Sequence, residues 1–496
     1  MWMSTAVRLS VVIVALTTPS TVLAQMPEPR QPRPVAPIAL SIEDAVRRSL
    51  GTSEEVRLAV SDVEAATTRL RIARAARLPQ INATTSYTAT FESPFRRGLE
   101  FTLPPDEQFD PDPSAPLDER VRYLEENADK AVLTTLADLL STSLQGVGLG
   151  SPHTYTVNLG GSQLLFSSGR VGAAIDIAMR AQEAATFQTR ERSGDVELDV
   201  RTAYYQALLA RELEVIAEAA LVQAESFLNQ VRLRLKAGYA ADLDVMRAEV
   251  SLENLRPQLV EAQNARQLAE LNLKRLANIP LDQPIALTTL LQVPVQPLEE
   301  PPRQDAEALL LQRPAVLAAE AQIEARRAGI DAARAEYLPS VALQVAYGAQ
   351  AFPQGLVDFS NAGWRPNGTA TVAVQIPVFS GFQRAADVGQ AQVQLRQAEL
   401  QAAQLREAVH LEYEQALGER ERARATIAAR QRTVDQAQRV YELTVLRFDQ
   451  GQATQLEVSD SRLALLQARS NLAQALTAYY IANASVRRAL GLTAAP

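Results

Sequence analysis

Hydrophobic and polar side chains alternate one by one in four short segments of the chain. These segments lie near residues 80–91, 154–166, 340–349 and 369–379. A period of two predicts β-strands with one apolar face and one polar or small face. Each segment has about the 9–11 residues that a tilted strand needs to cross a bilayer, although a half-buried sandwich strand shows the same alternation. Its recurrence in four matching places favours membrane strands.

Elsewhere, hydrophobic residues follow helical spacing over unusually long stretches. No proline occurs in residues 153–256 or 378–495. Residues 172–236 alone predict a helix of about 100 Å at 1.5 Å per residue, which suits either a tunnel wall or a solvated coiled-coil stalk. Gly238 and Gly451 interrupt the two runs. We expect each glycine to end one helix in the left-handed conformation and to turn the chain into a helix hairpin.

The chain carries this pattern twice. Phe166 and Phe379 each precede one of the long helical runs and lie 213 residues apart, and the same number separates Gly238 from Gly451. A constant offset over such a distance indicates two copies of one module, and an internal repeat determines the fold. We therefore expect one elongated body with two similar halves.

The repeat and the prolines divide the chain into five predicted segments. Residues 1–24 combine a basic start, a short apolar core and small residues, which predicts a secretory signal peptide. Residues 25–40 form a proline-rich linker to the first repeat, residues 41–280. A second proline-rich joint, residues 281–302, leads to the second repeat, residues 303–496.

Several local features refine this division. Ser41, followed three residues later by an aspartate, predicts the start of a helix that continues to Leu78. Pro257 is expected to kink the returning helix of the first hairpin. Only the first copy has a long acidic insertion between its strands, residues 92–152. It predicts an amphipathic helix, with one face formed by Leu124, Ala128, Val132, Leu136 and Leu140.

Composition excludes several classes of function. The chain has no cysteine, which rules out disulfides, thiolate metal sites and a lipid-anchored N-terminal cysteine. Its two histidines, His153 and His410, match no metal-binding spacing. A net charge of −8 disfavours nucleic acid, because phosphate binding needs a positive face. We find no catalytic pair or phosphate loop and expect neither an enzyme nor a bound cofactor or metal.

The strand count also carries a consequence for assembly. No stretch has the roughly 18 consecutive apolar residues of a membrane helix. Four strands cannot close a membrane barrel alone, because known barrels have about eight or more. Unpaired strand edges are not tolerated in lipid, so a four-stranded membrane segment requires oligomerisation.

The ordered set of motifs, present twice, resembles the TolC-like outer membrane efflux proteins over essentially the whole chain after the signal peptide. The most specific residues are Arg313, Pro314, Val316, Ala318, Ala319, Glu320, Leu338, Pro339, Ile376, Pro377, Val378, Phe379, Ser380 and Gly381, with Arg447, Phe448, Gly451, Leu456, Val458 and Ser461 at the second tip.

The resemblance implies an α+β membrane protein that forms a homotrimer. Each chain would contribute four strands to one shared transmembrane β-barrel and two hairpins to a periplasmic α-helical coiled-coil barrel. The protein would lie in outer membrane lipid, extend into the periplasm and act as a passive exit channel of a tripartite efflux or type I secretion system. Its partners would be a periplasmic adaptor protein and an inner-membrane pump of the RND, ABC or MFS class.

The resemblance also implies two kinds of functional residue. Asp244, Glu457 and Asp460 would lie at the periplasmic entrance, where threefold symmetry makes rings of carboxylates that select cations. Acids in a first helical turn also complement the helix dipole, and the two roles are compatible. Phe448 stands where the family often has a tyrosine and is the expected contact that closes the tip. The glycine tips, at Gly238 and Gly451, would dock the adaptor.

Two departures and one alternative remain. Leu164 occupies the place of Pro377 in the second copy, so the corner between strand and helix could differ between the copies. Ala453 replaces an arginine that the family often has near the second tip. The alternative function is a soluble periplasmic coiled-coil adaptor or scaffold, which would need no strands facing lipid.

Overall fold

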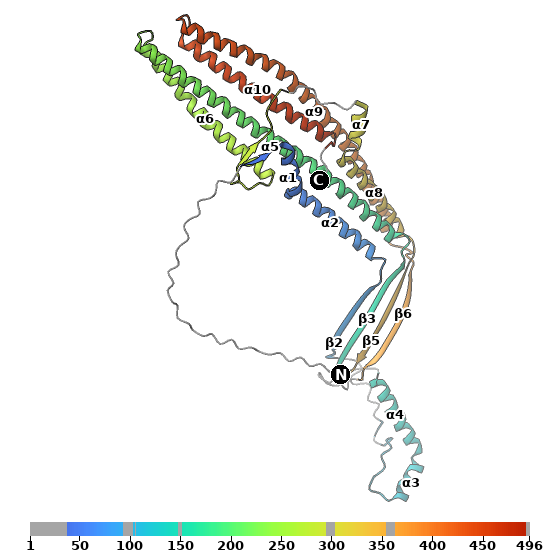
Figure 1. Cartoon of the computed structure of the whole chain (residues 1–496). Coiled ribbons are helices and arrows are strands. Elements are labelled where there is room, and N and C mark those ends of the chain that lie inside the picture. The colour runs from blue at the N-terminus through green and yellow to red at the C-terminus, as the bar shows by residue number, and fades with distance from the viewer. Residues whose placement is uncertain are drawn as a thin grey trace, which may run out of the picture.

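The computed structural model describes residues 37–92, 103–104, 106–146, 151–293, 303–353 and 363–492. The predicted signal peptide, most of both proline-rich linkers and the two ends of the insertion lie outside these residues. Within them, the chain is elongated (Figure 1). Long helices form one end, a four-stranded sheet follows, and the two helices of the insertion lie at the far end.

The long helices form two hairpins whose bounds repeat with one offset. Helix α5, Arg170–Lys236, turns into α6, Asp242–Leu276. Helix α9, Gln383–Asp449, turns into α10, Gln455–Ala489. Each bound of the second hairpin lies 213 residues after its counterpart, so the offset read from the sequence holds throughout both hairpins. Helix α6 continues through Pro257, where we expected a kink.

Shorter helices connect the hairpins to the strands. Helix α2, Glu54–Ala75, and helix α8, Pro314–Ala335, have 22 residues each and pack on α5 and on α5 with α9, respectively. Between Ser41 and Leu78 we expected one helix, and this expectation is wrong. The chain forms α1, Ile42–Thr52, and then α2, because Ser53 between them has a ψ of 132° and leaves the helical conformation.

Ser41 caps α1 as predicted, and the small elements complete the repeat. Its hydroxyl accepts the Asp44 N–H at 3.1 Å. Strands β1, Ile38–Leu40, and β4, Ile285–Leu287, pair in parallel beside the hairpins. Helix α7, Arg303–Leu311, precedes α8. Around β1 and β4, the largest buried cluster includes Leu40, Val200, Tyr204, Ala207 and Leu273.

Four antiparallel strands form a sheet in the order β2-β3-β5-β6. They are β2, Gln80–Ala89, β3, His153–Phe166, β5, Ser340–Ala351, and β6, Arg365–Gln375. The last strand lies about one helical turn of sequence earlier than the predicted 369–379. It ends before Pro377, whose missing N–H cannot extend a strand ladder.

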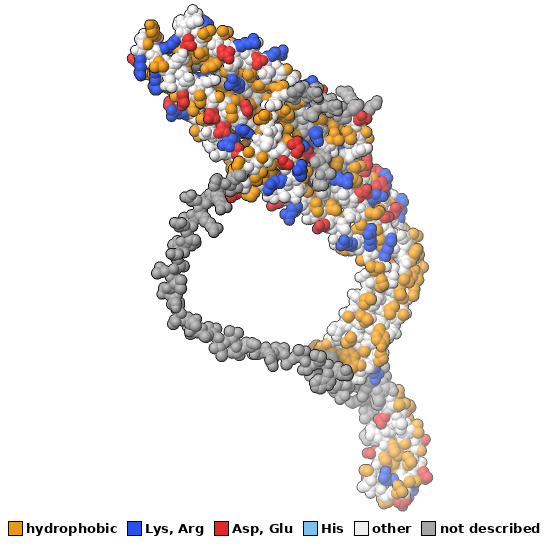
Figure 2. Space-filling view, viewed as in Figure 1, with side chains coloured by type: hydrophobic (Ala, Val, Ile, Leu, Met, Phe, Trp, Pro, Cys, Tyr) orange, Lys and Arg blue, Asp and Glu red, His pale blue; other side chains and the backbone are white. Residues whose placement is uncertain are grey.

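Strand register places the apolar side chains of all four strands on one face. Paired positions across the sheet include Ala83 with Leu159, Leu159 with Tyr347, and Leu343 with Val372. The opposite face is polar or small; it carries Asn82, Thr84, Ser86, Thr156, Asn158, Gln344, Gly348, Thr369 and Thr371. Arg365 is the only Lys, Arg, Asp or Glu in these strands. The visible face of this region is accordingly almost free of charge, unlike the helices (Figure 2).

Both corners from strand to long helix use a pair of left-handed residues. In the first copy these are Ser168 (φ 52°) and Gly169 (φ 88°), and in the second Gly381 (φ 61°) and Phe382 (φ 65°). The two pairs are 213 residues apart, with glycine in opposite places. The corners therefore share a backbone conformation, and the exchange of Leu164 for Pro377 does not change it.

The insertion forms two helices where we expected one. Helix α3, Leu117–Glu126, ends at Asn127, whose φ of −124° breaks the helix before α4, Ala128–Gly146. The preceding loop packs on both. Phe109 stacks near Tyr123 with ring centroids 5.6 Å apart, and its N–H donates to the Thr134 hydroxyl at 3.0 Å.

Candidate functional site at the hairpin tips

Each hairpin turns at a glycine in the left-handed conformation. Gly238 has a φ of +78° and Gly451 a φ of +75°. Beyond each helix end, the next N–H groups bond back to the last turn. The Tyr239 N–H donates to the Arg234 carbonyl and the Gln452 N–H to the Arg447 carbonyl, both at 2.8 Å. This pattern is a Schellman cap, in which glycine avoids the Cβ clash of a left-handed residue.

The two tips are joined by a contact that sequence reasoning did not find. Arg234, in the last turn of α5, donates to the carbonyls of Phe448 at 2.7 Å and Asp449 at 2.6 Å. Its guanidinium lies 4.5 Å from the centre of the Phe448 ring, and Phe227 approaches the same ring at 5.1 Å. Phe448 is 8% exposed. It therefore packs between the two hairpins of its own chain.

The carboxylates predicted at the entrance first serve the ends of their own helices. The Glu457 carboxylate accepts the Thr454 N–H at 2.6 Å, and the Thr454 hydroxyl accepts the Glu457 N–H at 3.3 Å, which is a complete capping box. Asp244, at the equivalent position, accepts the Ala241 N–H at 3.1 Å. These hydrogen bonds from Thr454 hold the pKa of Glu457 below its ordinary value. Asp460 is exposed one turn further along.

A buried arginine lies between the hairpins behind the tips. Arg462, on α10, is 6% exposed, and its Nη2 donates to the Ser251 hydroxyl of α6 at 2.5 Å. Burial lowers the pKa of Arg462 and raises that of the neighbouring Tyr441. A lone arginine in a helical pattern gave no signal of this position, because its burial arises only when the hairpins pack together.

A second charged cluster fastens the repeats to each other near the middle of the helices. Arg313, 3% exposed at the start of α8, binds Glu191 of α5 at 2.6 Å and Glu412 of α9 at 2.7 Å. Arg488 of α10 binds Asp195 at 2.5 Å and also contacts Glu412. Burial alone would raise the pKa of Glu412, but Arg313 and Arg488 outweigh it and lower the pKa.

Two searches of the described part of the chain bear on other kinds of site. Among those residues, no group of three or more His, Asp or Glu side chains could hold a metal ion. None of the described helices is long and apolar enough to cross a membrane.

Comparison with known proteins establishes the family. The model of the outer membrane efflux protein family matches residues 128–278 and 306–492, well over half of the chain. The protein therefore belongs to the outer membrane efflux protein family. The resemblance inferred from the sequence motifs is confirmed, and the alternative of a periplasmic adaptor or scaffold has no support.

Individual relatives agree with the family. OpmQ of Pseudomonas putida, the pyoverdine export outer membrane protein, is 29% identical over 358 residues, which is 68% of this chain and 70% of OpmQ. Solved structures of CusC and of VceC from Vibrio cholerae superimpose with TM-scores of 0.69 and 0.68. They are 20% and 18% identical and cover 94% and 91% of this chain, and 98% and 96% of their own chains. At these identities the likeness shows a shared fold.

Proposed function

We propose that this outer membrane efflux protein is a trimeric, passive exit duct. Three chains would combine their four-stranded sheets into one closed transmembrane barrel of twelve strands. Their six helix hairpins would continue this barrel as a tunnel into the periplasm. Substrates would be driven through the duct by an inner-membrane pump.

The two-faced sheet is the observation that carries this proposal. Its apolar face is exposed in the single chain, including Ile81, Leu159, Tyr347 and Val372 at 53–70% of their full accessible area. Its edge strands β2 and β6 have no further strand beside them in the described residues. Lipid would cover the apolar face, and neighbouring copies would pair with both edges, because unpaired edges are not tolerated in a bilayer.

The hairpin tips support a role for partner proteins. Both tips expose tight turns at the end of the molecule farthest from the sheet (Figure 1). We infer that Gly238 and Gly451 present these turns to a periplasmic adaptor, which would connect the duct to a pump of the RND, ABC or MFS class. We also infer that Asp244, Glu457 and Asp460 surround the entrance in each copy and favour the passage of cations.

Export and assembly are tested together. Membrane fractionation of cells, followed by light scattering on detergent-extracted protein, should find the chain in the outer membrane as a species of three copies. The predicted signal peptide, residues 1–24, should be absent from this species, and no lipid should be attached. A single copy in the periplasmic fraction would contradict the proposal. Affinity purification after crosslinking in cells should then recover one adaptor and one inner-membrane pump.

A further inference from the structure

The internal repeat allows one place in the molecule to be compared with its own counterpart. Helices α2 and α8 have equal length, and the residues before them, Ser53 and Arg313, have nearly the same backbone: φ −56° and ψ 132° against φ −57° and ψ 135°. The two long hairpins correspond residue by residue at an offset of 213. Asp199 therefore corresponds to Glu412, and Arg275 to Arg488.

In the second repeat this place is filled by the Arg313 side chain. Its guanidinium is buried and lies between Glu412, at 2.7 Å, and Glu191, at 2.6 Å. Arg488 approaches the same Glu412 from α10. The chain thus shows how this fold holds a guanidinium group at this position, with two carboxylates as its partners.

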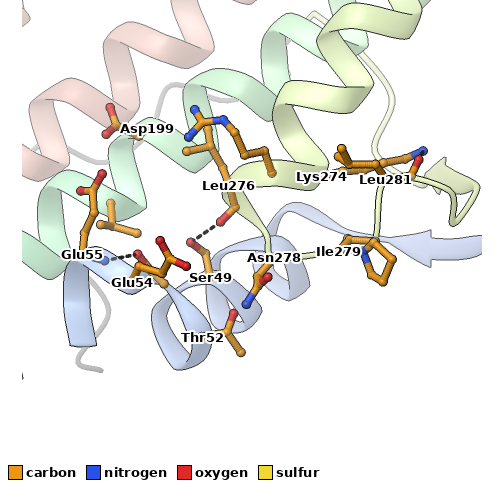
Figure 3. Close-up of a pocket in the computed structure, with 14 residues that line it drawn as sticks. Ser49, Thr52, Glu54, Glu55, Asp199, Lys274, Leu276, Asn278, Ile279 and Leu281 are labelled. Atoms are coloured by element: carbon orange, nitrogen blue, oxygen red, sulfur yellow. Dashed lines mark hydrogen bonds between the residues drawn. The ribbon is translucent and has the colours of Figure 1, made fainter. Parts of the chain in front are cut away.

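In the first repeat the arginine is replaced by a serine, and a cavity of about 460 Å³ is present instead. Ser53 lines this cavity together with Asp199 and Arg275, the counterparts of Glu412 and Arg488. Glu54 and Glu55, in the first turn of α2, also line it (Figure 3). A serine is several heavy atoms shorter than an arginine, so the counterpart of the Arg313 guanidinium is missing.

The charges around the cavity leave two carboxylates unpaired. Lys274 donates to the Leu281 carbonyl at 3.2 Å and, in Figure 3, lies apart from the carboxylates. Arg275 donates to Asn272 at 3.2 Å. The side chains of Glu54 and Asp199 make no hydrogen bond or ion pair within the described part of the chain.

The environment of Asp199 agrees with a missing cation. Burial raises the pKa of Asp199, and the negative charges of Glu55 and Asp195 raise it further. Arg192 and Arg275 lower it but do not compensate. Arg192 is already engaged by Glu55 at 2.7 Å.

We propose that this cavity is a binding site for a guanidinium group, with Asp199 and Glu54 as its carboxylate partners. The bound group would occupy the place that the Arg313 side chain fills in the second repeat. It could belong to a small solute or to an arginine side chain of another polypeptide. This site lies on the helices, away from the hairpin tips, and does not depend on the proposed assembly.

The first experiment uses N-propylguanidinium, which has the atoms of an arginine side chain. Calorimetric titration of the detergent-purified full chain should show one saturable site per chain. Asp199→Asn should weaken binding at least tenfold, because it removes a charge-assisted hydrogen bond. Ser53→Arg should abolish binding by filling the cavity and should raise the melting temperature. Asp62→Asn, which changes an exposed carboxylate elsewhere on α2, should bind like the wild type.

A second variant makes the same test in reverse. Arg313→Ser should open the counterpart cavity in the second repeat and lower the melting temperature. Millimolar N-propylguanidinium should restore part of that loss and should bind a second site per chain. If Arg313→Ser does not fold, the wild type and Ser53→Arg still decide the matter. Absence of binding to the wild type, or equal binding by Asp199→Asn and Ser53→Arg, would overturn the proposal.

The source of the guanidinium is separated by two further ligands. Free arginine carries a carboxylate and an ammonium close to its side chain, whereas the blocked peptide acetyl-Gly-Arg-Gly-amide carries neither. Tighter binding of free arginine would assign the site to a solute. Tighter binding of the blocked peptide would assign it to a side chain of a polypeptide partner.

Discussion

At the scale of single residues, the tips show how one carboxylate can act on its own helix and on the surroundings. Glu457 and Asp244 occupy the third position of α10 and α6 and accept N–H groups that the helix leaves unpaired. Their negative charge also complements the positive end of each helix dipole. Neither role uses more than one edge of the carboxylate, so the same charge remains available to an aqueous entrance.

The cap gives a prediction with a definite pH dependence. The folded-state pKa of Glu457 lies below its ordinary value of 4.5. Its contribution to stability is therefore present above pH 4.5 and is lost as the pH falls through the lowered pKa. At pH 7, Glu457→Gln should speed hydrogen exchange in the first turn of α10. The difference from the wild type should vanish in acid. Glu399→Gln, in an exposed part of α9, is the control and should have no effect at either pH.

The proposed carboxylate rings are tested by ion selectivity. In planar bilayers, the combined variant Asp244→Asn, Glu457→Gln and Asp460→Asn should lose cation preference and be blocked less by multivalent cations. The reason is that a ring field acts within about 8 Å at physiological salt. If the selectivity of the variant equals that of the wild type, these acids serve only their helix ends.

At the scale of elements, each hairpin depends on a turn that a side chain with a Cβ disfavours. No atom lies within 4 Å of a Cβ built at Gly238 or Gly451, so the cost of a substitution is the backbone conformation alone. Gly238→Val and Gly451→Val should each cost about 1–2 kcal/mol of local stability. We expect weaker adaptor binding and efflux with the trimer intact. Gly418→Ala, inside α9, is the control. Full adaptor binding by both variants would show that the tips do not dock it.

The insertion gives a second prediction at this scale, and the absence of cysteine makes it practical. Residues 92–152 connect β2 to β3 and lie at the end of the sheet opposite the hairpins (Figure 1). We predict that this end faces the outside of the cell. A membrane-impermeant maleimide should label Asp129→Cys on intact cells, and should label Tyr239→Cys at the tip only after permeabilisation. The reverse pattern would mean that the topology is inverted.

At the scale of the whole molecule, the two faces of the sheet must meet different surroundings. Val372 lies on the apolar face and Thr371 on the polar face of the same strand, and both are exposed in the single chain. Val372→Arg should cost about 2–4 kcal/mol in lipid and prevent trimer assembly. Thr371→Arg should assemble as the wild type does, since its side chain would face water. Light scattering of membrane extracts measures both. Equal assembly of the two variants would contradict a lipid-facing apolar side.

Features set by local spacing were predictable from the sequence. The 213-residue offset located both long hairpins, and Gly238 and Gly451 gave the turns, because left-handed helix ends select glycine. Errors came where a single residue interrupts a periodic pattern. Ser53 splits α1 from α2 and Asn127 splits α3 from α4, although the apolar spacing continues through both. Hydrophobic spacing reports which face is buried and does not report a local change of ψ.

The sequence by itself determined the family, the period of each element, the repeat and the capping acids, because all of these depend on residues close together in the chain. Only the tertiary structure decided which distant side chains meet. Phe448 contacts Phe227 and Arg234 from the other hairpin, and Arg313 joins helices that are 99 and 122 residues away. The cavity beside Ser53 likewise exists only where α2, α5 and the end of α6 pack together. Such meetings depend on the packing register of long helices, which periodicity leaves free.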